Sequence, residues 1–489
     1  MIYRAAIHRT FEAGGQTFAY SAASGAVVAL DETSQAVLKR CATSDGVDHP
    51  RWLDSAPDET RLTQREAFEE LVGMGLVRSE FEPALNSDPL PESAFPLQTV
   101  VLNVTNKCNL SCSYCYEFGE DRLSDATRAR APRMSEETAR ASLDMLFEKS
   151  GRLRDLTVTF FGGETLLNLD TIRASVDYAE RRARETGKRV SFALTTNATL
   201  LDEATIAFLV EHRFGVNISI DGAQGDHDRH RTFKSGKGSY SVVLPRIRAL
   251  LAAMRGRGGR PVGARVTLTR GMADIAETYR HLHDEVGFES VGFAPVTSSS
   301  ERDFALPAEE MDRLLRGFAA LAEEYVAAAT QDRQHGFSNL HDLLGELHRG
   351  VSKAHPCGAA LGLVGVSTEG QISPCHRFVE SDAHVMGDVK TGIDEKLRAE
   401  FLHAGHVAQK IPCHSCFARP HCAGGCYHEA HVRYGDAGSP NLHACDWIRA
   451  WTALGLDCYA RIWLANPGYL DRFEERPKLA VRSSSETQA

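Results

Sequence analysis

Three cysteines in one short stretch, Cys108, Cys112 and Cys115, constrain this chain more than any other feature. They have C-x3-C-x2-C spacing and follow the apolar run Thr99–Val104, which predicts a strand that ends in a tight loop. Such a loop can gather three thiolates around one centre. Three thiolates leave one iron of a four-iron cluster without a protein ligand, so that iron can bind another molecule. Zinc fingers pair two C-x2-C halves, and in ferredoxins a fourth cysteine follows closely, so neither pattern matches.

The triad resembles the hallmark of the radical S-adenosylmethionine (SAM) enzymes, C-x3-C-x-aromatic-C, with Tyr114 in the aromatic position. The resemblance implies a [4Fe-4S] cluster whose open iron chelates the amino and carboxylate groups of SAM. An electron then splits the sulfonium and yields a 5′-deoxyadenosyl radical, which abstracts hydrogen from an unactivated position. The resemblance also implies an electron donor such as flavodoxin or ferredoxin.

The composition of the chain argues against some classes of binding partner. A length of 489 residues favours two to four domains, and a net charge of -10 argues against a nucleic-acid partner. No apolar run approaches the length of a membrane span, and the N-terminus lacks the apolar core of a signal peptide. We therefore expect a cytoplasmic protein with no membrane partner. In that compartment the twelve cysteines are metal ligands more readily than disulfides.

Residues 1–80 predict a small module of three short strands followed by helices. Asp31 is the expected cap of a helix ending at Cys41, a core thiol, and Thr63 with Glu66 forms a predicted capping box. The expected strands, separated by glycine turns, are Ala5–Phe11, Thr17–Tyr20 and Ala26–Leu30. The module resembles the winged-helix-like peptide-recognition domain of maturases that act on ribosomally made peptides, where a leader peptide adds a strand to the sheet. A dimerisation or purely structural module is the alternative.

Strands and helices alternate over residues 99–304, which predicts a parallel sheet with helices outside. The expected strands are Thr99–Val104, Leu156–Phe161, Val190–Thr195, Val216–Ile220, Gly263–Thr269 and Ser290–Ala294. The expected helices include Glu136–Phe147, Leu169–Glu185, Glu203–Val210, Tyr240–Ala253 and Asp274–Glu285, with Ser135 and Asn168 as caps. The resemblance implies an α/β class chain with a partial (β/α)6 radical SAM barrel, whose chemistry lies at the carboxyl ends of the strands.

Polar residues follow the predicted strands where that chemistry is expected. Two glycines before Glu164 let a backbone approach a ligand closely, and Glu164 can accept a hydrogen bond from an ammonium group. The resemblance implies cofactor-binding roles for Tyr114, Tyr116, Gly162, Gly163, Glu164, Asn197, Ser219, Asp221 and Arg231. The stretch from His227 to His230 is expected to be a solvated loop and not a metal site. The sequence identifies no catalytic base.

The remaining cysteines lie in the last third of the chain. The run C-x2-C-x5-C-x3-C, with further cysteines on both sides, resembles the SPASM extension of radical SAM peptide maturases, which holds two auxiliary clusters. Three [4Fe-4S] clusters are then implied. One auxiliary ligand set is Cys413, Cys416, Cys422 and Cys445; the other is Cys357, Cys375 and Cys426, with Cys458 or an open iron in the fourth position. One or two structural zinc ions are the alternative.

The expected organisation is a recognition module at 1–80, a linker at 81–98 and the barrel at 99–304. Connecting helices at 305–350, an auxiliary-cluster domain at 351–475 and a disordered tail at 476–489 follow.

These features predict an enzyme that modifies a substrate polypeptide carrying a leader segment. Residues 114–121 and the sequence Cys375-His-Arg-Phe most resemble the maturation enzymes of quinohemoprotein amine dehydrogenase, which link Cys sulfur to the methylene carbons of Asp or Glu. A maker of carbon–carbon cyclophanes and a sulfatase-maturing Ser/Cys oxidase are alternatives within the family. A non-catalytic peptide-binding scaffold and a zinc-stabilised scaffold are the alternatives outside it.

Overall fold

The computed structural model describes residues 2–43, 45–48, 51–52, 55, 57–80, 95–123, 130–256, 261–272 and 274–474. The predicted linker lies outside these residues up to residue 94, and the predicted tail lies wholly outside them. Among the helices of the described residues, none is long and apolar enough to cross a membrane.

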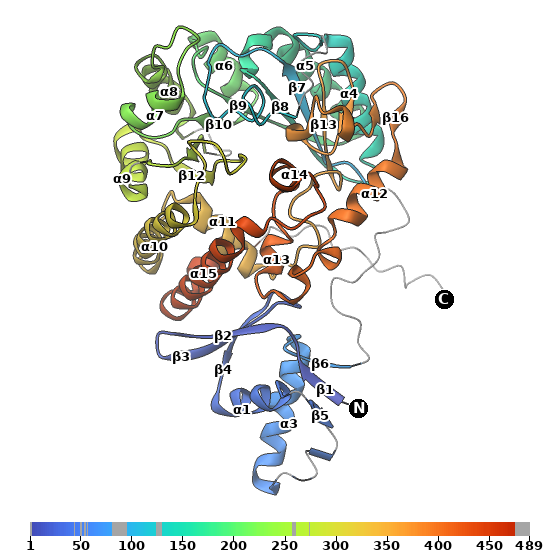
Figure 1. Cartoon of the computed structure of the whole chain (residues 1–489), viewed down its shortest axis with the longest axis vertical. Helices are drawn as coiled ribbons and strands as arrows, with labels where there is room; N and C mark the ends of the chain where they lie inside the picture. The colour runs from blue at the N-terminus through green and yellow to red at the C-terminus, as the bar shows by residue number, and fades with distance from the viewer. Residues whose placement is uncertain are drawn as a thin grey trace.

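An eight-stranded sheet with the order β12-β11-β10-β9-β8-β7-β13-β14 occupies the centre of the larger part of the molecule (Figure 1). Six of its strands are the predicted ones: β7 (Thr99–Thr105), β8 (Asp155–Gly162), β9 (Arg189–Thr196), β10 (Gly215–Ser219), β11 (Gly263–Leu268) and β12 (Ser290–Pro295). Each of these six runs parallel to its neighbours. The prediction of an open, six-unit α/β barrel is therefore confirmed, and the carboxyl ends of its strands meet at one edge.

Helices connect these parallel strands and cover the sheet. They are α4 (Glu136–Lys149), α5 (Leu169–Thr186), α6 (Glu203–Glu211), α7 (Gln224–His230), α8 (Tyr240–Met254) and α9 (Ile275–Arg280). Ser135 caps α4 as predicted, since its hydroxyl accepts from the Thr138 amide at 3.1 Å. Asn168 does not cap α5: its side-chain amide instead donates to the carbonyls of Val104 and Met134, at 2.8 and 3.0 Å. A 3-10 turn, η1 (Thr165–Asn168), leads straight into α5, so the helical start lies further back, at Glu164.

The C-terminal part of the chain extends the barrel sheet. Strand β13 (Leu363–Val366) pairs in parallel with β7, and β14 (Ile372–Ser373) pairs antiparallel with β13. Helices α10 (Ala308–Thr330) and α11 (Ser338–His348) match the predicted connecting pair. They pack on α15 (Cys445–Ala465). The rings of Phe318 and Trp451 meet there edge-on, with their centres 5.2 Å apart. The auxiliary-cysteine region is thereby anchored to the edge of the barrel at β7.

The N-terminal module lies at one end of the molecule and has two small antiparallel sheets (Figure 1). Strands β2 (His8–Ala13), β3 (Gln16–Ser21) and β4 (Val27–Leu30) form one, and β5 (Val47–Asp48), β1 (Ile2–Ala5) and β6 (Val77–Ser79) form the other. The predicted single strand Ala5–Phe11 is wrong, because β1 and β2 belong to different sheets. Cys41 is buried in the module's core as predicted.

One helix of the module starts as predicted and the other does not. Asp31 caps α1 (Glu32–Cys41) by accepting from the Ser34 amide at 2.7 Å. Helix α3 (Asp58–Gly73) begins well before the predicted capping box, and the Thr63 hydroxyl, inside the helix, donates to the Thr60 carbonyl at 3.0 Å. Pro57 at the cap and acidic residues in the first turn favour the earlier start.

Candidate functional site

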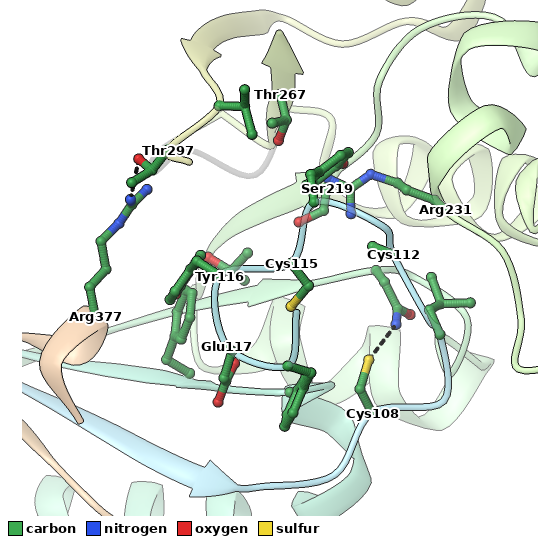
Figure 2. A pocket seen from close by; sticks show the side chains of 18 of the residues that line it. Cys108, Cys112, Cys115, Tyr116, Glu117, Ser219, Arg231, Thr267, Thr297 and Arg377 are labelled. Carbon is green, nitrogen blue, oxygen red and sulfur yellow. Dashed lines mark hydrogen bonds between the residues drawn. The ribbon is translucent and has the colours of Figure 1, made fainter. Parts of the chain in front are cut away.

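A cavity of about 190 Å³ opens where the barrel strands end (Figure 2). The loop after β7 contributes Cys108, Cys112 and Cys115 to its wall. The other wall residues follow the remaining strands or come from the C-terminal region, and include Gly162, Gly163, Asn197, Ser219, Arg231, Thr267, Thr297 and Arg377. Most of the predicted cofactor-binding residues thus surround one space.

The three thiols of the loop are partly buried beside one another. Burial is the main cause that raises the pKa of Cys108 to about 12 and that of Cys115 to about 11. Without a cation these groups are therefore thiols at neutral pH. Iron binding must displace their protons, and burial then shields the metal–thiolate bonds from water.

Two glycines bring the end of β8 against the cysteine loop. A Cβ atom on Gly163 would lie 2.1 Å from the carbonyl oxygen of Lys107, and one on Gly162 would lie 2.4 Å from that of Thr105. Gly162 also has φ of 108°, a conformation that favours glycine. The glycines are needed first for contact between two backbones, and that contact fixes the position of Cys108.

Glu164 does not line the cavity, and its role toward an ammonium group stays a prediction. Its carboxylate is 1% exposed and accepts from the Thr196 hydroxyl at 2.6 Å and from the amides of Asn197 and Leu166, at 2.8 and 3.1 Å. All of these partners belong to the protein, so Glu164 ties the end of β9 to the end of β8. It holds Asn197 in place, and the nitrogen of the Asn197 side-chain amide lies 3.9 Å from the Cys108 sulfur.

Asp221 and Arg231 form a buried ion pair at 2.9 Å beside the cavity. Asp221 also accepts from the Tyr114 hydroxyl and from the Thr267 amide, the latter at 3.0 Å, and it does not line the cavity. Arg231 does line it and faces the Cys112 thiol. The oxygens of Asp221 hold Arg231 and Tyr114, and its contact with the cofactor stays a prediction. Ser219 and Arg231 remain the groups of this strand end that reach the cavity.

The histidine-rich stretch is helix α7 and not the solvated loop that was predicted. His227 is 1% exposed and its Nε2 lies 2.9 Å from the Ser239 hydroxyl. Burial and the nearby Arg231 lower the His227 pKa to about 4. His230 contacts the hydroxyl of Ser113 in the cysteine loop at 2.7 Å. The stretch is a support for that loop.

Two charged residues of the cavity were missed from the sequence, Glu117 and Arg377. Burial, followed by the nearby Glu380 carboxylate, raises the pKa of Glu117 to about 8, and its one side-chain donor is Asn103 at 3.3 Å. Arg377 follows Cys375 by two residues and reaches the cavity from the C-terminal region. Spacing alone gives no signal for either, since each depends on how distant segments pack.

The auxiliary cysteines form two groups, as their predicted sets require, apart from Cys458. Cys413, Cys416, Cys422 and Cys445 line a single pocket. The thiols of Cys357, Cys375 and Cys426 lie near enough for charge on one to raise the pKa of another. Cys357 and Cys375 precede the first group in the sequence, and Cys426 lies between its members Cys422 and Cys445.

Cys458 belongs to neither group, which corrects the tentative assignment. It is fully buried in the apolar core, on the same helix as Cys445. Thirteen residues of α-helix separate the two positions by about 20 Å. The charged groups that act on Cys458 are Asp457, Arg461 and Glu323, from α15 and α10. Without Cys458, the Cys357 group consists of three cysteines.

Lys410 lies between the two auxiliary groups. It is 1% exposed, and its Nζ has no hydrogen-bond partner among the described residues. The Nζ lies 4.9 Å from the centre of the Tyr427 ring, and the absent side chain of Gly424 leaves room for the Lys410 stem. The groups near it that can carry negative charge are Cys413, Cys422, Asp436 and Cys357. A buried ammonium group without a partner in the protein suits a site that receives negative charge.

The cysteine groups have the ligand chemistry of iron–sulfur clusters. Three cysteines line the cavity at the barrel edge, and four of the auxiliary cysteines line a second pocket.

Comparison with known proteins agrees with this geometry. Residues 102–282 match the Radical SAM superfamily. A serine-type anaerobic sulfatase-maturating enzyme of Bacteroides thetaiotaomicron is 26% identical over 373 residues, which cover 72% of this chain and 87% of that protein. The radical SAM cyclopropyl synthase TigE of Paramaledivibacter caminithermalis is 25% identical over 142 residues, 28% of this chain and 29% of that protein.

Solved structures show the same fold. Native anSMEcpe with bound AdoMet superposes with a TM-score of 0.59 at 18% identity, over 77% of this chain and 98% of that one. The superfamily match, the open parallel barrel and the thiol triad at its carboxyl edge agree with one another. SAM and a [4Fe-4S] cluster are the cofactors of this family, and the triad and its cavity fit them. Residues 102–282 are therefore a radical SAM domain, and the chain is a radical SAM enzyme.

Proposed function

We propose that the chain forms thioether crosslinks in a ribosomally made polypeptide, joining a Cys sulfur to a side-chain carbon of Asp or Glu. The observation that carries this proposal is the shared cavity. The thiol triad lines one side of it, and Arg377, two residues after the auxiliary Cys375, lines another. A substrate side chain in this cavity would lie between the two kinds of cysteine site. Relatives that mature sulfatases support a polypeptide substrate.

Each cysteine group has a proposed role. Cys108, Cys112 and Cys115 would hold the SAM cluster, and the two auxiliary groups would hold the SPASM clusters, with the Cys357 group open at its fourth position. When bound, SAM and its cluster supply a 5′-deoxyadenosyl radical that abstracts hydrogen. Gly162, Gly163, Asn197, Ser219 and Arg231 would surround SAM, with Asp221 and Tyr114 fixing Arg231 from behind. An external donor such as flavodoxin or ferredoxin would supply the electron that starts the reaction.

The reaction balance explains why a second redox site is useful. Replacing one C–H and one S–H bond by one C–S bond releases a hydrogen atom, a proton and an electron. The hydrogen atom would go to the 5′-deoxyadenosyl radical, the electron to the auxiliary site, and the proton to a side-chain base or water. A cavity lined by the triad and by Arg377, two residues after Cys375, would bring the first two acceptors near one substrate.

The N-terminal module is the proposed site for the leader segment of the substrate. One of its two sheets, β2-β3-β4, has β2 and β4 as its edge strands. The β2 side packs on the C-terminal region, where Arg9 lies over the Phe417 ring at 4.9 Å and Phe18, on β3, contacts Trp463 at 6.1 Å. Strand β4 is therefore the edge that we propose for strand addition, since an added strand gains main-chain hydrogen bonds. Deleting residues 1–80 should abolish binding of the leader, and unchanged affinity would remove this part of the proposal.

Oxidation of a Ser or Cys in a sulfatase is the second candidate function. The observation in its favour is the similarity to a sulfatase-maturating enzyme over 87% of that protein's length. Such oxidation leaves an aldehyde, whereas thioether formation consumes a thiol and leaves none. An enzyme that forms cyclophanes would leave the thiol free and would form no aldehyde.

The three products are distinguished by one experiment. The reconstituted chain is incubated with SAM, a reductant and a Cys- and Asp-containing precursor peptide, such as one encoded beside its gene. The product is treated separately with a thiol-alkylating reagent and with a hydrazide, and then fragmented by mass spectrometry. Our proposal predicts loss of hydrogen, a Cys that resists alkylation and no hydrazide adduct. An adduct supports the sulfatase-type oxidation, and an alkylatable Cys with hydrogen loss supports a carbon–carbon link.

A further inference from the structure

Arg377 is the one guanidinium of the cavity that the described protein leaves without a carboxylate. It lies in η3 (His376–Phe378), and its Nη1 donates to the Thr297 hydroxyl at 2.8 Å. Its guanidinium carbon lies 4.8 Å from the centre of the Tyr116 ring. No ion pair joins Arg377 to an acidic residue among the described parts of the chain. The second cavity guanidinium, Arg231, is by contrast fully paired with Asp221.

The acidic side chains nearest Arg377 are committed elsewhere. Glu429 pairs with Arg433 at 3.4 Å. Glu117, which like Arg377 lies near Tyr116, accepts from Asn103 at 3.3 Å. The other groups that act on Arg377 are Tyr116 and the thiols of Cys375 and Cys426. Most of its hydrogen-bond donors therefore remain available to a molecule that enters the cavity.

A second polar group in the same part of the cavity is also without a partner. The Tyr116 hydroxyl is buried, and no hydrogen bond to it exists among the described residues. A buried hydroxyl in this state costs free energy unless a ligand satisfies it. Arginine and a phenol both donate, so together they favour an acceptor-rich group such as a carboxylate.

This part of the cavity is separate from the predicted SAM side. Figure 2 shows Arg377 and Thr297 at the left of the view, with Ser219 and Arg231 at the right, on the side of Cys112. The separation argues that the carboxylate of SAM and a carboxylate at Arg377 are different groups.

We propose that Arg377, Thr297 and Tyr116 form a subsite for a carboxylate of the substrate, so that the cavity selects an Asp or Glu side chain. The subsite rests on the proposed function, because it names the residue that would carry the crosslinked carbon. The guanidinium would hold the carboxylate in two hydrogen bonds and leave the neighbouring methylene in the cavity. Thr297, just after β12, orients the guanidinium of Arg377. Arg377 orients the substrate and is therefore the specificity-determining residue.

The test measures binding, not turnover, to the reconstituted chain with SAM present. N-acetyl-aspartate methylamide is the probe, and N-acetyl-asparagine methylamide differs from it only in the charged group. Affinities come from the ligand-dependent shift of the unfolding temperature, and SAM affinity is measured separately by equilibrium dialysis. The variants are Arg377→Gln and Arg377→Lys, with Arg140→Gln on an exposed helix face as the matched control.

The proposal predicts that the parent chain binds the aspartate probe about tenfold more tightly than the asparagine probe. Arg377→Gln should remove this preference while leaving SAM affinity within about twofold of the parent value, and Arg377→Lys should retain part of it. Equal affinity of the parent for both probes would overturn the subsite. Loss of SAM affinity in Arg377→Gln, with the probe preference intact, would also overturn it and assign the guanidinium to SAM.

The outcome is independent of the crosslinking assay. If the chain binds the aspartate probe through Arg377 but forms no thioether, the proposed function fails and the carboxylate subsite stands. If Arg377→Gln does not take up iron, Arg377→Lys keeps the charge and carries the test: a lysine variant with full iron and no probe preference at all contradicts charge recognition at this position.

Discussion

A single methyl group at Gly163 should separate the cysteine loop from the barrel. In Gly163→Ala the new Cβ would lie 2.1 Å from the Lys107 carbonyl oxygen, 2.5 Å from the Lys107 carbonyl carbon and 3.1 Å from the Cys108 amide nitrogen. All three atoms are backbone, so no side chain can rotate away to make room. The hydrogen bond from the Glu164 amide to the Lys107 carbonyl, 2.9 Å long, crosses the same contact.

The size of the displacement follows from these distances. Real Cβ atoms essentially never approach closer than 3.0 Å, so the contact must open by at least about 0.9 Å, the difference between 3.0 and 2.1 Å. Overpacking of this kind costs about 1–3 kcal/mol of folding free energy. Metal and catalytic sites tolerate only about 0.5 Å of error in the position of their ligands. We therefore expect Cys108 to lose its place in the triad while the barrel remains folded.

Iron content and unfolding temperature together measure this effect. Gly163→Ala should reconstitute with about four fewer irons per chain than the parent, and should bind no SAM, because only the triad site is lost. Gly225→Ala is the matched control, since its Cβ meets nothing within 4 Å and an alanine in helix α7 is favourable. A Gly163→Ala chain with full iron and parent-like SAM affinity would refute the claim that this backbone contact positions the cysteine loop.

Three further predictions test other parts of the structure. His227 has a folded pKa of about 4, below its unfolded value of about 6.5, so its contribution to stability is complete above pH 6.5 and is lost as the pH falls toward 4; it is up to about 3 kcal/mol. His227→Gln should flatten the dependence of unfolding free energy on pH in that window, and exposed His403→Gln should not; equal slopes would contradict the account. Lys410→Met should lower the reduction potentials of the auxiliary clusters in an EPR-monitored titration, while Lys410→Arg and the triad cluster stay near the parent values; an unchanged auxiliary potential would exclude Lys410 as their charge partner. Cys458→Ala should keep the full iron content and lose about 1 kcal/mol of stability through its core cavity, and a loss of iron would restore it as a ligand.

The barrel was predictable because its signals are local and repeated. Runs of Val, Ile and Leu with polar residues at their ends mark six parallel strands, and the structure has all six in sequence order. The pairing of β13 with β7 was not predictable, since it joins segments more than 250 residues apart. Similarly, the split between β1 and β2 depends on which sheet each strand joins.

The site was predictable by position but not by the direction of its side chains. Spacing placed Glu164 and Asp221 at strand ends correctly, yet their carboxylates turn toward protein donors and away from the cavity. Spacing also made Cys458 a candidate ligand, because a sequence does not show how far a straight helix carries it from Cys445. Arg377 lies in the sequence Cys375-His-Arg-Phe, but its place in the cavity depends on how the C-terminal region packs on the barrel.

The most direct test of the account combines the metal content of the reconstituted chain with cleavage of SAM. We predict about 12 irons per chain with matching sulfide and little zinc, and production of 5′-deoxyadenosine from SAM under reducing conditions. Replacing Cys108, Cys112 and Cys115 with Ala should leave about eight irons and no 5′-deoxyadenosine. Zinc with little iron, or 5′-deoxyadenosine formed equally by the triple variant, would contradict the central claim that this triad holds the cluster that reduces SAM.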